Sequence, residues 1–185
     1  MTAFFSGTVA REPALLLLAV AIVCALTDLK RGRIYNAVTY PAVLAGFALQ
    51  FCLYGTTGAL SSLGGFAVGF VPAFILFTVG GMGGGDVKLL GAVGAIAGAV
   101  AAAETLILAF LFGGLFALFK LAWRGRLLRT LGRPLRVVAG WVVPGVTLAE
   151  PWDAPSLTVP FGAAIALGAL ATLWDLHTGS LLGLL

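Results

Sequence analysis

Long apolar runs, separated by short polar segments, constrain this chain more than any other feature of its sequence. A helix that spans the hydrocarbon core of a membrane needs roughly 20 mostly apolar residues. Six runs approach or reach this length, at 13–27, 37–54, 60–79, 87–103, 105–123 and 157–174. The runs lack the alternating pattern of barrel strands, so we expect them to form helices.

Composition agrees with a membrane protein. The 185 residues are 61% hydrophobic and only 10% charged, whereas a soluble domain carries about 25% charged residues. Six helices leave almost no residues for a soluble domain. We therefore predict an all-α fold in which residues 1–185 form a single membrane-embedded domain with six transmembrane helices.

The basic residues predict how these helices are oriented. Lys30, Arg31 and Arg33 follow the first apolar run, which is opposite to the polarity of a signal peptide and favours a retained helix. Basic loops lie on the cytoplasmic side of a membrane. If the loop that carries Lys30 to Arg33 is cytoplasmic, Arg11 is the one basic residue of the 11 that lies outside. We expect a multi-pass protein of the inner (cytoplasmic) membrane with both termini outside. The net charge of +4 fits membrane lipid rather than nucleic acid as a partner.

The segment between the fifth and sixth runs carries four arginines spaced three, four and three residues apart. On a helix they would form one face, which predicts a basic amphipathic helix on the cytoplasmic membrane surface. It could dock substrate or lipid, or it could only anchor the topology. The four residues are Arg126, Arg129, Arg133 and Arg136.

Two acids stand out from the others. Asp28 follows the first apolar run and Asp86 precedes the fourth, so both are expected at the cytoplasmic ends of their helices. An acid next to apolar protein or lipid is costly and becomes a functional candidate. Two carboxyl groups at one membrane depth could share a proton, activate water and protonate a leaving amine. The remaining acids fall near predicted helix ends and are interpreted as solvated charges.

The stretch "GGMGGGDVKLL", residues 80–90, places Asp86 directly after a cluster of glycines. Glycines lack side chains, so they would let a substrate backbone approach the acid. The alternative is a flexible loop in which Asp86 caps the helix, with Asp28 as an interfacial acid. The sequence has no paired cysteines for zinc and no complete nucleotide-binding motif, so we expect no metal and no cofactor.

The chain resembles a known family at three places. Gly83–Gly84–Gly85–Asp86 matches the Gly–x–Gly–Asp signature of intramembrane aspartyl proteases. "MGGGDVKLLGAVGA" and "TDLKRGRIYN" look like the corresponding segments of the prepilin peptidases (type IV leader peptidases), and "VPFGAAIALG" is similar to their closing Pro–aromatic–Gly segment.

This resemblance implies an aspartyl endopeptidase with catalytic residues Asp28 and Asp86. The substrate would be a prepilin, which has a basic leader and an apolar helix and is cut at the cytoplasmic membrane face. Larger members carry an additional Cys-rich domain, and without it this chain resembles the short type, which implies a role in the biogenesis of Tad/Flp-like pili or in a related secretion system. Implied substrate-binding residues are Gly83, Gly84, Gly85, Lys88, Pro160, Phe161 and Gly162.

Two other functional classes remain open from the residues themselves. The two aspartates could instead relay protons or cations in a small membrane transporter. The chain could also be a non-catalytic assembly partner of a pilus or secretion system. The sequence leaves the oligomeric state open.

Overall fold

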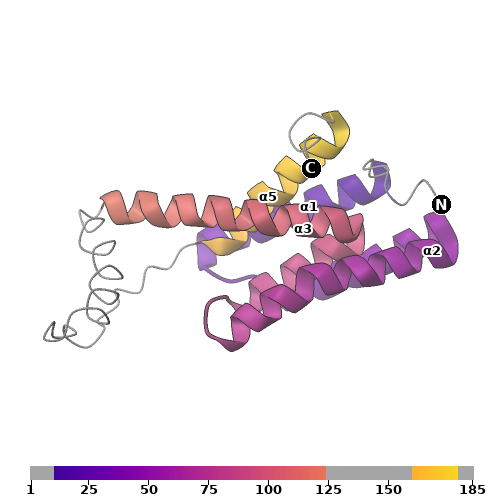
Figure 1. Cartoon of the computed structure of the whole chain (residues 1–185), viewed down its shortest axis with the longest axis horizontal. Coiled ribbons are helices and arrows are strands. Elements are labelled where there is room, and N and C mark those ends of the chain that lie inside the picture. The colour runs from indigo at the N-terminus through magenta and orange to yellow at the C-terminus, as the bar shows by residue number, and fades with distance from the viewer. Residues whose placement is uncertain (1–10, 124–159, 179–185) are drawn as a thin grey trace, which may run out of the picture. The chain divides into compact units, whose positions relative to one another are not determined.

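The described part of this computed structural model consists of helices joined by short links. The structure describes residues 11–123 and 160–178. The helices are α1 (Arg11–Arg31), α2 (Asn36–Thr78), α3 (Gly84–Trp123) and α5 (Phe161–Thr178) (Figure 1). These ranges contain no strand, which confirms the predicted all-α class.

Two of the helices are interrupted, each at a glycine. Gly55 in α2 has φ 62° and ψ −142°, and Gly98 in α3 has φ 89° and ψ −179°. Residues with side chains rarely adopt such positive φ values, whereas glycine does so at little cost. Within the described ranges, the backbone therefore forms six helical stretches, and their bounds are 11–31, 36–54, 56–78, 84–97, 99–123 and 161–178.

These bounds correct the sequence prediction in two places. The predicted gap between the fourth and fifth runs fell at Glu104, but the break lies at Gly98 and Glu104 is inside α3. The last helix begins at Phe161 rather than at residue 157. The number of membrane crossings stays a prediction, and the basic segment 124–159 lies outside the described residues.

The two halves of α2 pack against the first half of α3 through glycines. A β-carbon on Gly65 or on Gly94 would overlap the backbone of the other residue. A β-carbon on Gly46 would lie 2.9 Å from the carbonyl carbon of Ala95, and one on Gly69 would overlap the carbonyl of Leu90. Small residues let helix backbones approach closely, which is the usual basis of helix packing inside membranes.

The break at Gly98 has its own hydrogen-bond partners. The last carbonyls of a helical stretch lack partners within that stretch, and an unsatisfied carbonyl in hydrocarbon costs several kcal/mol. The Gln50 side chain donates from Nε2 to the Ile96 carbonyl at 2.7 Å. The Ser62 hydroxyl donates to the Ala95 carbonyl at 2.6 Å. Two polar side chains of α2 thus stabilise the interruption in α3.

The core lies between the helices, and large apolar side chains also cover the outside. Helix α1 packs against α5 and α2, with Leu17, Cys24 and Ile165 fully buried. By contrast, Leu44 is 70% exposed and Leu60 67% exposed. Helices α1, α2 and α3 are each long and apolar enough to cross a membrane. An apolar exterior on such helices indicates a membrane protein.

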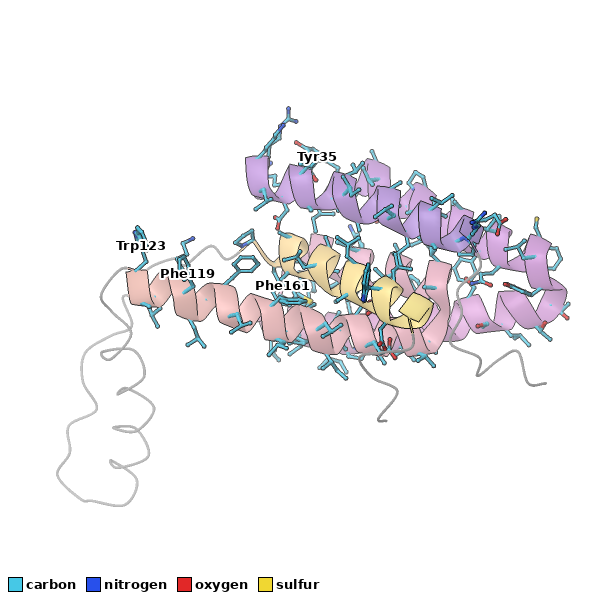
Figure 2. The ribbon with its side chains drawn as sticks, turned by 90° about the horizontal axis from the view of Figure 1, so that it is seen from above. Tyr35, Phe119, Trp123 and Phe161 are labelled. Carbon is cyan, nitrogen blue, oxygen red and sulfur yellow. The ribbon has the colours of Figure 1, made fainter. Side chains whose placement is uncertain are left out.

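The structure divides into two compact units. One comprises Met1–Gly113 with Pro160–Leu185, and the other Gly114–Val159. In the second unit the structure describes the end of α3, where the rings of Phe119 and Trp123 lie 6.0 Å apart (Figure 2). Asp28, Asp86 and helix α5 all belong to the first unit. The prediction of a single domain for residues 1–185 stays a prediction.

Candidate active site

Asp28 is held in the last turns of α1. The helix runs three residues beyond it to Arg31, so Asp28 does not close the helix as the sequence suggested. Gly32 ends the helix in a left-handed conformation, with φ 60°, and its N–H donates to the Asp28 carbonyl at 2.7 Å. A glycine cap of this kind turns the chain sharply. The link formed by residues 32–35 therefore passes beside the Asp28 side chain before α2 begins.

Asp86 lies in the first turn of α3. The helix begins at Gly84, and the N–H groups of Asp86 and Val87 donate to the Gly83 carbonyl at 3.1 and 3.3 Å. Asp86 is therefore the third residue of the helix and not its N-cap, which corrects the alternative interpretation from sequence. Its carboxylate lies close to Gly83, because a β-carbon there would be 2.9 Å from Asp86 Oδ2.

The two aspartates line one cavity of about 240 Å³. Carboxylates that face the same small space cannot both ionise at low cost, so such a pair tends to share a proton. One acid in each protonation state is the arrangement required for general acid–base hydrolysis. The other residues that line the cavity are Gly32, Arg33, Ile34, Gly83 and Gly85.

The start of α5 lies directly against Asp28. The backbone N–H of Ala163 donates to Asp28 Oδ2 at 3.1 Å. A β-carbon on Gly162 would lie 2.9 Å from the same oxygen and 2.7 Å from Ile34 Cδ1, which is closer than side chains normally approach. Gly162, which the resemblance assigned to substrate binding, therefore packs against a candidate catalytic side chain.

Ile34 is a residue of the site that the sequence did not point to. It packs against both Gly162 and Gly85, since a β-carbon on Gly85 would lie 2.9 Å from Ile34 Cβ. It thus joins the α1–α2 link to the starts of α3 and α5. The available signal was an apolar residue inside the basic segment "KRGRIYN", where a solvated residue would be expected.

Two of the predicted substrate-binding residues, Gly83 and Gly85, line this cavity. The others do not: Gly84, Lys88, Pro160, Phe161 and Gly162. Lys88 donates from Nζ to Asn36 Oδ1 at 2.9 Å and lies 5.1 Å from the centre of the Tyr40 ring. It thereby joins the first turns of α3 and α2. Gly84 packs against the ring of Phe77, and a β-carbon there would be 3.4 Å from Cε2.

Pro160 and Phe161 fix the beginning of α5. The Pro160 carbonyl accepts the first helical hydrogen bond, from the N–H of Ala164 at 3.3 Å. The Phe161 ring, labelled in Figure 2, lies 5.5 Å from that of Phe110 on α3. These contacts hold the α5 terminus in place and so support the hydrogen bond of its third residue to Asp28.

Besides Glu12 in the first turn of α1, the described helices contain two further acids, Glu104 and Asp175, and one prediction about these two is wrong. Asp175 is only 7% exposed, so it is not a solvated charge at a helix end. It lies within electrostatic range of Glu104, and the Thr105 and Thr172 hydroxyls near them are 3.2 Å apart. Neither acid lines the cavity of Asp28 and Asp86. Across residues 11–123 and 160–178, no three His, Cys, Asp or Glu side chains cluster as a metal site would require.

Comparison with known proteins identifies a family. The sequence model of the type IV leader peptidase family matches residues 15–118. This range is more than half of the chain and contains Asp28, Asp86 and the glycine cluster, while α5 lies beyond it. No curated protein and no solved structure matches the chain.

Proposed function

The chain belongs to the type IV leader peptidase family, and we propose from this premise that it is an aspartyl endopeptidase whose catalytic residues are Asp28 and Asp86. Membership of a peptidase family favours peptide hydrolysis over transport. The observation that carries the aspartyl mechanism is the shared cavity: Asp28 from α1 and Asp86 from α3 line the same 240 Å³.

The proposed reaction needs one ionised and one protonated carboxyl group. The ionised group takes a proton from a water molecule as the water oxygen bonds to the scissile carbonyl carbon. The protonated group donates to the carbonyl oxygen, which gives a tetrahedral diol. When the C–N bond breaks, the leaving nitrogen receives the proton taken from water, and the diol returns a proton to the other carboxyl.

The proposed substrate is a prepilin with a basic leader and an apolar helix. A substrate anchored by such a helix would reach a peptidase that is itself embedded in the membrane. The aspartates lie at the ends of α1 and α3 where the basic residues Arg31 and Arg33 gather, and basic segments favour the cytoplasmic side. We therefore propose that the chain crosses the inner membrane six times, with both termini outside. Cleavage would take place at the cytoplasmic face and would contribute to the biogenesis of Tad/Flp-like pili.

The proposal is tested with the purified protein in detergent and a purified prepilin. Mass spectrometry of the products should show a single cut that separates the basic leader from the apolar helix. A matched prepilin with its leader already removed should remain intact. An uncut prepilin under conditions in which the enzyme is folded would contradict the proposed substrate.

A further inference from the structure

Four phenylalanines of α2 form a continuous row of rings along its second helical stretch. Phe66, Phe70, Phe74 and Phe77 recur at helical spacing, which places them on one side of the helix. The ring centroids of successive pairs lie 5.0, 5.5 and 6.1 Å apart, and the first two pairs are stacked. We call these four residues the α2 aromatic row.

The aromatic row is partly covered by α3 and partly open. A β-carbon on Gly91 would lie 2.9 Å from the Phe66 ring and 3.4 Å from the Phe70 ring. By contrast, Phe74 is 45% exposed and Phe77 44% exposed. The rings are therefore held by α3 and by one another, and an apolar surface remains open at the Phe74–Phe77 end.

This open end adjoins the cavity of the two aspartates. The Phe77 ring packs against Gly84, and the chain neighbours of Gly84, which are Gly83 and Gly85, line that cavity. From Phe77 back to Phe66 the helix is roughly 17 Å long, at 1.5 Å per residue. The row therefore extends from the site over about half the thickness of a hydrocarbon core.

If the proposed function holds, we propose that the aromatic row is the surface on which the apolar helix of the prepilin lies while its scissile bond occupies the cavity. The cut separates the basic leader from this apolar helix, so the helix must begin close to the bond that is cut. A row of rings that begins beside the cavity and continues along α2 meets this requirement.

Charge favours this surface over the apolar side of α1, which also lies near Asp28. A second cavity, of about 320 Å³, is lined there by apolar side chains and by Lys30 and Arg31. A substrate helix placed on α1 would bring its basic leader against these two cations, and like charges repel. Residues 66–85 contain no charged side chain, so the aromatic row presents no such barrier.

The order of the rings favours a protein helix over lipid as the occupant. Stacked side chains have little rotamer freedom left to lose, and docking on a preorganised surface avoids that entropy cost. Aromatic side chains also supply large contact areas and carry much of the binding energy in protein interfaces. A helix with a fixed shape gains from such a surface, whereas fluid lipid chains gain little from its order.

The direct test is photo-cross-linking in membranes to a co-expressed prepilin. In an Asp86→Asn background that leaves the substrate uncut, p-benzoylphenylalanine in place of Phe74 should cross-link to the apolar helix of the prepilin. The same probe in place of Ile75 is the matched control, because Ile75 is 58% exposed at the same depth but points about 100° away around the helix. Equal cross-linking from both positions, or cross-linking from position 74 to lipid alone, would overturn the proposal.

A second measurement uses the purified full chain and steady-state kinetics. Phe74→Ala should raise KM for prepilin about tenfold, the scale of one lost interface anchor. The kcat value should change little, because Phe74 does not line the cavity. Ile75→Ala should keep the wild-type KM, and an unchanged KM in a folded Phe74→Ala enzyme would overturn the proposal.

The two proposals fail in different ways. A folded wild-type protein that leaves prepilin uncut would refute the proposed function. Normal cleavage by the wild-type protein, without cross-linking from position 74 to the prepilin helix, would refute the docking surface alone.

Discussion

Gly85 and Ile34 are in such close contact that a β-carbon on Gly85 would lie 2.9 Å from Ile34 Cβ. This contact sets how closely the start of α3 approaches the link that follows Asp28. The glycine cluster therefore has a structural use that the sequence did not reveal. It allows two helices to bring their aspartates to one cavity, in addition to any room that it leaves for substrate.

The first prediction concerns this contact. Gly85→Ala should force Ile34 away and displace Asp86 relative to Asp28. A misplacement of about 1 Å lowers the rate of a well-positioned reaction roughly 100-fold, so kcat for prepilin cleavage should fall about 10- to 100-fold. Gly64→Ala is the matched control, because a β-carbon at Gly64 meets nothing within 4 Å. Equal activity of the two variants would show that the contact does not position the site.

The second prediction separates two roles of Lys88. The structure gives it a partner, Asn36, on α2, whereas the resemblance assigned it to substrate. If Lys88 acts through Asn36, the effects of Lys88→Met and Asn36→Ala on stability should be non-additive by about 0.5 kcal/mol or more. KM should then change little. Additive effects on stability, together with a raised KM in Lys88→Met alone, would favour direct contact with substrate.

The third prediction concerns the interruption at Gly98. Ser62→Ala removes the donor to the Ala95 carbonyl and leaves that carbonyl unpaired in an apolar region. The free energy of unfolding in mixed detergent micelles should fall by about 1–3 kcal/mol. The neighbouring variant Ser61→Ala is the control. The Ser61 hydroxyl also lies beside Gly98, 3.4 Å from where a β-carbon on Gly98 would stand, but the described donors to the carbonyls before the break are Gln50 and Ser62. An unfolding free energy unchanged in Ser62→Ala would mean that another group satisfies the carbonyl.

The fourth prediction concerns the acids that do not line the cavity. Glu104→Gln and Asp175→Asn keep the shape of each side chain and should process prepilin at near the wild-type rate per folded molecule. Western blotting of the membrane fraction corrects for any loss of protein, which is expected to be larger for the buried Asp175. Abolished processing in a well-expressed variant of either residue would bring it into the mechanism.

Apolar run lengths were sufficient to predict the all-α class and the approximate place of each helical stretch. They could not locate the break at Gly98, because the apolar pattern continues through it and Gly98 is one of many glycines in the region. The contact between Asp28 and Ala163 joins residues 135 positions apart. Such a pairing depends on how helices pack and leaves no local pattern, so the role of Gly162 beside Asp28 could not be predicted.

The burial of Asp175 was missed for a related reason. Its position near the end of an apolar run favoured a solvated interpretation, but helix α5 continues to Thr178. The two candidate catalytic aspartates could be found because a charge beside an apolar run is unusual. The basic residues predicted an orientation that puts both acids at one membrane depth; the orientation stays a prediction, and the common cavity is what the structure shows.

The central claim is that Asp28 and Asp86 act together as the catalytic pair. The most direct measurement is leader removal from a co-expressed prepilin by Asp28→Asn, Asp86→Asn and the double variant, with enzyme level in the membrane as the control. Each single change should abolish cleavage, and the double variant should be little worse, because groups that act as a unit are non-additive. A well-expressed single variant that still removes the leader at near the wild-type rate would contradict the aspartyl mechanism.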